Sequence, residues 1–191
     1  MKNDSLPRMI LSLGVITIIA GALLAAVYTI TSEPIAQAEK SAQIAAVKSV
    51  APEFDTMGEP VTLTDKSGHR MTIFPLTLKG KEVGAAIESY SMAGFSGEIS
   101  VMVGLGNDGT ITGYEVLKQG ETPGLGAKMN DWFRDPKGHR SVIGRQTSTP
   151  LTVAKDGGEI DGITAATISS RAFLDAVNRA AECYSNYSHE R

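Results

Sequence analysis

Hydroxyl side chains cluster where the last apolar-periodic run of the chain begins. The segment DGITAAT (161–167) is followed at once by ISS (168–170). A helix that starts near Ser169 leaves unpaired N–H groups and the positive end of its dipole beside Thr167, which favours a phosphate there. The same residues also suit an ordinary helix cap, because Ser and Thr accept hydrogen bonds from the first N–H groups of a helix. Local chemistry alone leaves both interpretations open.

A second Gly-rich segment, ETPGLG (121–126), has Pro followed by Gly at the centre of a turn. That order is typical of a type II turn. Such a turn exposes amide donors beside Leu125, which suits the edge of a planar ring with carbonyl and nitrogen acceptors. Gly126 would let another group approach the backbone closely. A simple connecting turn is the alternative.

The run of residues 9–30 is long enough to cross a membrane. It carries no formal charge, and as a helix it would span about 33 Å, the thickness of a bilayer core. The hydroxyls of Ser12, Thr17 and Thr29 are compatible with this, since each can bond a carbonyl one turn back. A cleaved signal peptide is the alternative, supported by the basic start and by AQA (36–38). The length of the run and its distance from that pattern favour an uncleaved anchor.

Charges on either side of this run predict its orientation. Lys2 and Arg8 precede it, and two acidic residues follow it closely. Basic flanks stay on the cytoplasmic side. Residues 1–8 are therefore expected in the cytoplasm, residues 9–30 in the lipid of the cytoplasmic (inner) membrane as a single pass, and the remainder on the periplasmic or outer side.

Composition excludes several function classes. The formal net charge is −3 with no basic run, so nucleic acid is not expected as a partner. Cys183 is the single cysteine, which excludes an intrachain disulfide, a four-Cys iron–sulfur cluster and a Cys-x-x-Cys-His haem site. An electron carrier built from this chain therefore needs an organic cofactor. No metal site and no hydrolase triad is expected, because the few histidines form no spaced pairs and no Ser/His/acid set is evident.

Turn signals divide the chain after the apolar run. Residues 31–52 are predicted to form a juxtamembrane helix, which either continues the anchor with a kink at Pro34 or restarts there. The segment 51–59 contains Pro, Gly and acidic residues and marks the start of a globular domain, residues 53–185. Residues 186–191 are expected to form a polar tail.

Short apolar runs alternate with turn signals in the globular domain and predict strands. Period-two residues over 99–105 lead through NDG (107–109) into a further strand, which is a hairpin pattern. Pro75 indicates an edge strand or a bulge. An amphipathic helix is predicted from about Ser169 to Tyr184. Strands first and a helix last predict an α+β domain with a mostly antiparallel sheet and flanking helices. The expected strands cover 61–64, 71–78, 83–90, 99–105, and 111 with 114–117.

Both Gly-rich segments match a known family. The segment 161–167 resembles the motif Asp-x-x-Ser/Thr-Gly-Ala-Thr, on whose last Thr a flavin transferase places FMN through a phosphodiester; Ala165 stands where Gly is commoner. The segment 121–126 is similar to a second signature of these FMN-binding domains, and GFSG (94–97) leads into the hairpin. With the anchor, the resemblance covers nearly the whole chain. The family includes the G subunit of the Rnf ion-translocating electron transport complex and the C subunit of the sodium-pumping NADH:quinone reductase; the short loops favour the Rnf type.

The resemblance implies an electron-carrier component rather than an independent catalyst. The chain would carry covalent FMN within a membrane complex that oxidises ferredoxin and reduces NAD while sodium ions or protons cross the membrane. The implied partners are the other Rnf subunits and the flavin transferase. The implied site residues are Thr167 as acceptor, Thr164 with Ser169 or Ser170 at the phosphate, Thr122, Gly124 and Leu125 at the ring, Asp161 in the transferase motif, and Glu121 and Gly126 in the second signature.

Several alternatives stay open. An extracytoplasmic sensor or scaffold could bind flavin without passing electrons, although so short a chain has no evident output module. Lys128 could stabilise a reduced, anionic flavin or lie in solvent. Trp132-Phe133 could stack on the ring or pack in the core. His69 and His139 are interpreted as surface residues.

Overall fold

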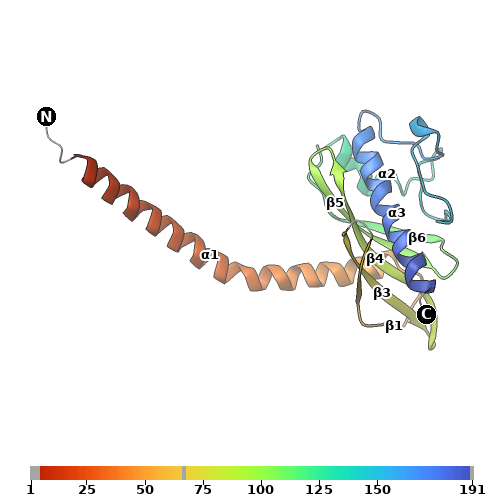
Figure 1. The fold of residues 1–191 in the computed structure, drawn as a ribbon. Coiled ribbons are helices and arrows are strands. Elements are labelled where there is room, and N and C mark those ends of the chain that lie inside the picture. Colours follow the sequence, from red (N-terminus) through yellow and green to blue (C-terminus); the bar gives the residue numbers. More distant parts are fainter. Residues whose placement is uncertain (1–4, 66–67, 190–191) are drawn as a thin grey trace. The chain divides into compact units, whose positions relative to one another are not determined.

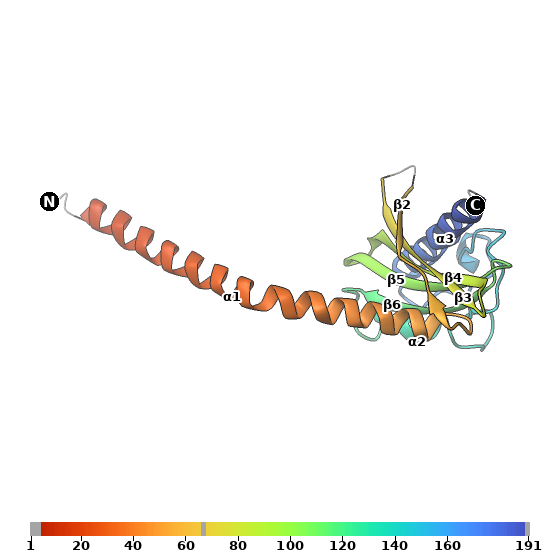
Figure 2. The ribbon, with the colours of Figure 1, turned by 90° about the horizontal axis from the view of Figure 1, so that it is seen from below.

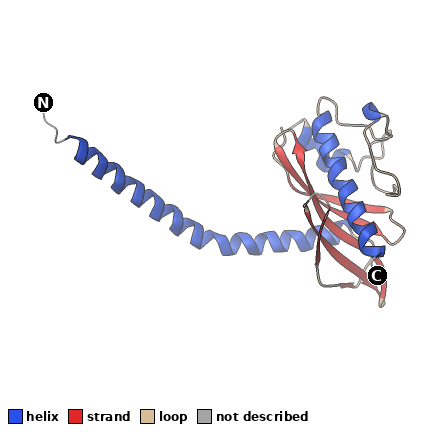
Figure 3. Cartoon of the chain, in the orientation of Figure 1, coloured by secondary structure: helices blue, strands red, loops and turns tan. Residues whose placement is uncertain are grey.

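The structure is a computed structural model that describes residues 5–65 and 68–189. By its internal contacts the chain divides into two units, residues 1–42 and residues 43–191. Figures 1 and 3 show the described elements. In chain order they are α1 (Ser5–Val50), β1 (Thr56–Met57), β2 (Val61–Thr64), β3 (Arg70–Leu78), β4 (Lys81–Gly94), β5 (Gly97–Gly106), β6 (Ile111–Lys118), η1 (Gly126–Lys128), α2 (Met129–Trp132), η2 (Ala154–Asp156) and α3 (Thr167–His189).

Helix α1 has the length and the apolar composition needed to cross a membrane. Its hydroxyls are satisfied within the helix, as predicted: Thr17 Oγ1, for example, donates to the Leu13 carbonyl at 2.8 Å, which removes the cost of burying it in lipid. Of the two possibilities at Pro34, a restart does not occur, because Pro34 lies inside α1. The helix then continues to Val50, two residues before Pro52.

The strands of the second unit form one antiparallel sheet in the order β1-β3-β4-β5-β6, with β2 also paired to β3. Strand β2 has the bounds expected from the sequence, and the predicted hairpin is β5 with β6. Its turn closes where Gly109 N donates to Gly106 O at 2.9 Å. The mostly antiparallel α+β prediction is therefore confirmed.

Pro75 lies where the sheet can tolerate a missing N–H. Strand β2 pairs with β3 through Ile73, and β1 pairs with it at Leu76 and Thr77, so Pro75 falls between the two paired segments. A register shift at Leu76/Thr77 follows immediately on the β4 side. Of the two possibilities indicated by the proline, the bulge is present, whereas β3 is not an edge strand because β1 and β2 pair with it on one side and β4 on the other.

Both faces of the sheet are buried. Figures 1 and 2 show α3 crossing one face. There strand residues pack against Phe173 and Val177 of the helix; they include Ile73, Ile87, Val101 and Val103. The alternate strand residues face the last turns of α1 and form a second cluster of Val47, Val50, Phe74, Leu76, Ala86 and Met102. Strands buried on both faces explain why these sequences are near-continuous apolar runs.

An aromatic cluster fixes the first turns of α3 against the sheet. The rings of Phe133 and Phe173 are stacked at 4.4 Å, and Tyr114 meets Phe173 edge-on at 4.8 Å. The Tyr114 hydroxyl donates to the Met129 carbonyl at 2.7 Å. Burial raises the pKa of Tyr114, so the group stays a neutral donor.

Helix α3 is longer than its apolar pattern predicted. It begins at Thr167 rather than near Ser169, and it continues through His189 into the segment expected as a polar tail. Tyr187 is buried, which accounts for the extra turn: an aromatic contact outweighs the polar composition around it. Residues 190 and 191 lie outside the described residues.

Candidate functional site

The 121–126 segment meets the first turn of α3, directly after the 161–167 segment, at one buried hydrogen bond. Ser169 Oγ, in the first turn of α3, donates to Glu121 Oε2 at 2.6 Å. The other carboxyl oxygen of Glu121 accepts from Ser96 N at 2.9 Å. Both Glu121 and Ser169 are buried, so this carboxyl group ties the β4–β5 hairpin loop and the 121–126 segment to the start of α3.

Gly126 makes this contact possible. A Cβ on Gly126 would lie 2.6 Å from Glu121 Oε2 and closer still to Ser169 Oγ, which no side chain can accommodate without displacing one of them. The sequence prediction that another group approaches the backbone here is confirmed, and the approaching groups are the two partners of the hydrogen bond.

The segment around Pro123 is the predicted type II turn. Thr122 O accepts from Leu125 N at 3.1 Å, and Gly124 has φ +79°, as the third residue of that turn requires. Residues 122–125 are exposed, with Leu125 40% accessible. An exposed leucine held on a fixed turn is an apolar edge available to a planar ligand.

Thr167, Thr164 and Asp161 share a different feature, an open pocket at the start of α3. Its volume is about 380 Å³. Thr167 is half-buried, whereas Thr164 is exposed. The remaining lining residues are Gly162, Ile163 and Ala165 of the same segment, and Trp132, Arg140, Val153, Ala154 and Lys155 from earlier in the chain. Residues 121–126 are not among the described residues that line it.

The four hydroxyls of residues 161–170 differ in what they contact. Ser169 is engaged by Glu121, as above. Ser170 is fully buried, where its Oγ accepts from Ile163 N and donates to Ala166 O, both at 2.9 Å. Thr164 and Thr167 are the two that line the pocket. Inward-facing serines therefore shape the turn, and outward-facing threonines remain available to a ligand.

Asp161 has a structural role in the turn before α3. Its Oδ2 accepts from His139 N at 2.9 Å, and its carbonyl accepts from Trp132 Nε1 at 2.7 Å. The guanidinium of Arg140 stacks over the indole ring of Trp132 at 3.9 Å. Asp161 thus joins the turn before α3 to the segment that follows α2.

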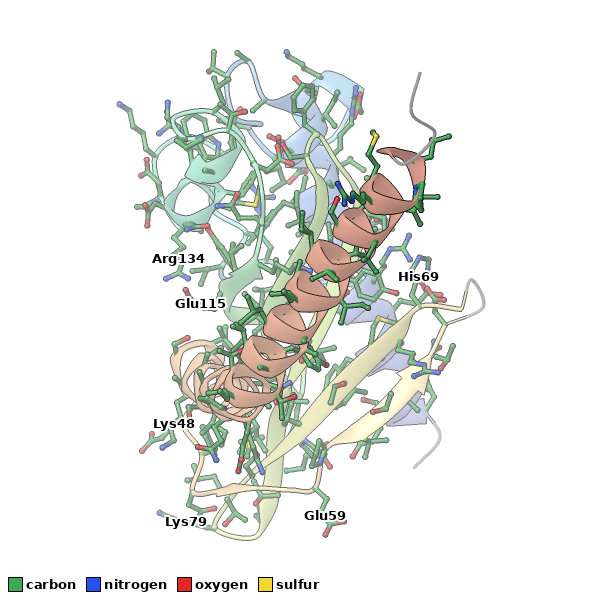
Figure 4. The ribbon with its side chains drawn as sticks, turned by 90° about the vertical axis from the view of Figure 1, so that its left-hand side faces the viewer. Lys48, Glu59, His69, Lys79, Glu115 and Arg134 are labelled. Carbon is green, nitrogen blue, oxygen red and sulfur yellow. The ribbon has the colours of Figure 1, made fainter. Side chains whose placement is uncertain are left out.

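Helix α2 is held by the edge of the sheet, which fixes Trp132. Arg134 and Glu115 of β6 lie side by side in Figure 4, with Arg134 Nη2 2.7 Å from Glu115 Oε2. The Arg134 guanidinium also donates to the Tyr114 carbonyl and lies 4.7 Å from the centre of the Tyr114 ring. Of the aromatic pair at 132–133, Phe133 belongs to the core and Trp132 to the pocket wall.

Ala165, the residue that departs from the family motif, has φ +61°. This is the left-handed region, which glycine enters freely and alanine only at a cost. The commoner Gly at this place of the motif therefore has a backbone explanation. The chain keeps the same turn with alanine, because Ser170 and Asp161 hold both ends of it.

Sequence reasoning missed two cations that line the pocket, Lys155 and Arg140. Lys155 Nζ donates to Thr167 Oγ1 at 3.2 Å. Neither residue lies in a recognisable motif, and they approach Thr167 only through the tertiary fold.

The other residues considered from the sequence lie outside this pocket. Lys128 and His139 are exposed. His69 is half-buried between Asp65 and Arg179, so it is not the surface residue that was expected. Among the described residues no group of three or more His, Cys, Asp or Glu is arranged to hold a metal ion.

Comparison with known proteins identifies the family. A model of the FMN-binding domain matches residues 94–182, which include both Gly-rich segments. The chain is 33% identical to the G subunit of the ion-translocating oxidoreductase complex of Aliivibrio fischeri strain MJ11, over all of this chain and 93% of the relative. The chain belongs to this G-subunit family. Further G subunits are 32% identical in Vibrio cholerae strain M66-2, covering 94% of this chain and 90% of the relative, and 33% identical in Methanosarcina acetivorans, covering 94% and 95%.

Membership in the G-subunit family confirms the resemblance drawn from residues 121–126 and 161–167. It supports FMN as the cofactor and an electron-transfer role in an ion-translocating oxidoreductase. The match to residues 94–182 begins at the last residue of β4 and ends within α3. The flavin-binding part of the chain is thus the part that builds the Glu121–Ser169 contact and the pocket.

Proposed function

We propose that Thr167 carries FMN through a phosphodiester bond and that the chain is the electron carrier of a membrane-bound ferredoxin:NAD oxidoreductase of the Rnf type. The observation that carries the proposal is the difference in surroundings among the hydroxyl groups of residues 161–170. Ser169 and Ser170 are bonded inside the protein, whereas Thr167 lines the pocket at the first residue of α3. Its hydroxyl is the one that combines access with a helix N-terminus, where a phosphate is favoured.

The residues present fit the phosphate end of FMN. The pocket contains the side chains of Lys155 and Arg140 and one carboxyl group, Asp161. Asp161 Oδ2 is already engaged by a backbone N–H. A phosphodiester placed on Thr167 would therefore share the pocket with two cationic side chains and one carboxylate, so the cations are in excess.

The chain's own residues position the ring. When bound, FMN supplies reversible electron transfer, and the protein supplies position and electrostatics. Glu121 and Gly126 hold the 122–125 turn at a fixed place beside the start of α3, so Thr122, Gly124 and Leu125 are proposed to line the ring. Thr164 is proposed to hydrogen-bond the phosphate. Asp161 holds the turn that presents Thr167 to the flavin transferase.

A covalent tether suits the location that we propose for the domain. The apolar part of α1 spans the cytoplasmic (inner) membrane once, with residues 1–8 inside and the FMN-binding domain outside. A flavoprotein on that side cannot replace a lost cofactor from the cytoplasm. Attachment at Thr167 also restricts where the ring can sit relative to its redox partners, which are the neighbouring Rnf subunits.

Site-directed variants test the acceptor. The chain is co-expressed with the flavin transferase and examined for flavin fluorescence after denaturing electrophoresis. Parent and Thr167→Ser are expected to fluoresce, because both retain an Oγ; Thr167→Ala is expected to be dark. Thr164→Ala, which removes a hydroxyl from the same pocket, is the control and keeps the fluorescent band at reduced yield. Fluorescence of Thr167→Ala would move the acceptor elsewhere.

The relay role has a separate test. A complex assembled with Thr167→Ala is expected to lose ferredoxin-to-NAD electron transfer while its subunit composition is unchanged. Full electron transfer by that complex would contradict the relay and favour a sensor or scaffold role.

A further inference from the structure

One lysine lies close to the proposed acceptor. Lys155 Nζ is 3.2 Å from Thr167 Oγ1, and Lys155 forms no ion pair with a carboxylate among the described residues. The other cation of the pocket, Arg140, is paired with Asp135 at 2.7 Å. Lys155 is therefore the pocket cation whose charge is not already compensated by an ion pair of its own.

The position of Lys155 is set by its neighbour in sequence. Asp156 accepts two hydrogen bonds from Arg171, from Nε at 2.7 Å and from Nη2 at 2.6 Å. Arg171 lies four residues after Thr167, one helical turn away on the same side of α3. This bidentate pair attaches η2 to the side of α3 that carries Thr167, and so keeps Lys155 at the acceptor.

The electrostatics of the Asp156–Arg171 pair are consistent with a maintained ion pair. The hydrogen bonds and charge of Arg171 hold the pKa of Asp156 below its ordinary value of 3.8, and the pKa of Arg171 is raised by the same partner. Both groups are thus charged over the whole physiological range. The charge of Lys155 lowers the pKa of Asp156 as well, but less than Arg171 does, and the hydrogen bonds to Asp156 come from Arg171.

We propose that Lys155 binds the anionic phosphodiester on Thr167 and that the Asp156–Arg171 pair positions Lys155 for it. This inference rests on the proposed function, because it needs the ester to be on Thr167. The ester carries one negative charge and the ammonium one positive charge. The lysine therefore replaces its present donation to the Thr167 hydroxyl by donation to a phosphate oxygen, which is two bonds from Thr167 Oγ1.

Phosphorus-31 NMR of the loaded, full-length protein reads this contact directly. Three variants are compared with the parent: Lys155→Met removes the ammonium, Lys155→Arg restores a cation, and Lys128→Met removes a lysine from the same domain but outside the pocket. In Lys155→Met the phosphodiester resonance is expected to shift toward its position in the denatured loaded protein. In Lys155→Arg most of that shift is expected to be reversed, and in Lys128→Met none is expected.

Two further readouts separate an electrostatic contact from a structural effect. The initial rate of flavin attachment by the transferase is expected to fall up to about fivefold in Lys155→Met, the size of an exposed ion pair. In the parent, adding salt should move the phosphorus resonance in the same direction as the variant does, because it screens the pair. Arg171→Met should shift the phosphorus resonance in the same direction as Lys155→Met does, but by a smaller amount. Thermal unfolding of the unloaded proteins should be unchanged by Lys155→Met, since Lys155 is exposed.

Each outcome has one meaning. If Lys155→Met is loaded at the parental rate and keeps the parental phosphorus resonance and salt response, the inference is wrong and the proposed function stands. If the parent itself carries no flavin on Thr167, the proposed function fails and the inference fails with it. The mass of the Thr167 peptide, measured on the same samples, distinguishes the two.

Discussion

Ser169 Oγ lies 2.6 Å from Glu121 Oε2, although the two residues are 48 positions apart in the chain, and this contact joins the 121–126 segment to the first turn of α3. The bond is buried, and the second oxygen of Glu121 is held by the backbone of the β4–β5 loop. This carboxyl group therefore places the β4–β5 loop and the 121–126 segment relative to the start of α3.

Loss of the Ser169 hydroxyl should destabilise the domain. In Ser169→Ala the Oε2 atom of Glu121 stays buried without its donor, which costs roughly 1–3 kcal/mol of unfolding free energy. Ser188→Ala is the control, because that hydroxyl bonds a carbonyl of its own helix and is exposed; its effect should stay within about 0.5 kcal/mol. Denaturant unfolding of the two variants measures both. Equal effects would show that the Glu121 contact contributes nothing.

A methyl group on Gly126 should disturb the same bond. Gly126→Ala places Cβ against Glu121 and Ser169, and overpacking of this kind costs about 1–3 kcal/mol. Gly120→Ala is the control, since its Cβ would meet Ser96 at an ordinary 3.7 Å. The double variant Gly126→Ala/Ser169→Ala should be less destabilised than the sum of the single variants, because removing Oγ relieves the clash. If the loss of unfolding free energy in the double variant equals the sum of the losses in the single variants, Gly126 and Ser169 do not act through the same contact.

Replacement of Ala165 by the motif's commoner glycine should stabilise the fold. The left-handed conformation costs alanine about 1–2 kcal/mol in the folded state. Glycine avoids this cost but gives the unfolded chain more conformational entropy, which offsets part of the benefit, so the net gain in unfolding free energy is about 0.5–1 kcal/mol. Lys79, with φ +53°, offers a second test through Lys79→Gly. Ala127→Gly, at a residue without a positive φ, should instead be destabilising. Thermal unfolding of unloaded protein compares the three; a lower melting temperature for Ala165→Gly would contradict the strain assignment.

Cys183 should be unreactive in the folded protein. It is 2% exposed, and burial, with the charges of Asp65 and Glu182, raises the pKa of its thiol to about 11 from an ordinary 9.0. A soluble maleimide at neutral pH is therefore expected to label only unfolded chains. Rapid labelling of the native protein would contradict this burial.

The raised pKa of Cys183 also predicts a pH dependence with a definite sign. Because the folded state disfavours the thiolate, its contribution to stability is fully present below pH 9 and is lost as the pH rises toward about 11. Tyrosines also titrate at high pH, so Cys183→Ala is the matched comparison: its unfolding free energy should fall less steeply between these pH values than that of the parent. Parallel pH profiles of the two proteins would show that the thiol does not contribute.

Local chemistry predicted several elements correctly from the sequence. Strand β2, the type II turn at Pro123-Gly124 and the bulge near Pro75 all depend on residues within a few positions of one another. The continuity of α1 through Pro34 could not be decided in this way, because a proline in a first turn and a proline inside a helix have the same sequence pattern.

Contacts between segments that are distant in the chain could not be predicted from short sequence patterns. Nothing in the order of residues shows that Glu121 receives Ser169, that Ser170 points inward to Ile163, or that Lys155 reaches Thr167. The end of α3 was underestimated for the same reason, since Tyr187 is stabilised by the core and not by its polar neighbours.

The mass of one peptide tests the central proposal most directly. Trypsin cleavage after Lys155 and Arg171 releases residues 156–171, which contain Thr164, Thr167, Ser169 and Ser170. From cells that contain the flavin transferase, we expect a gain of one FMN less one water, located on Thr167 by fragmentation. An unmodified peptide, or the same mass on one of the other three hydroxyls, would contradict it.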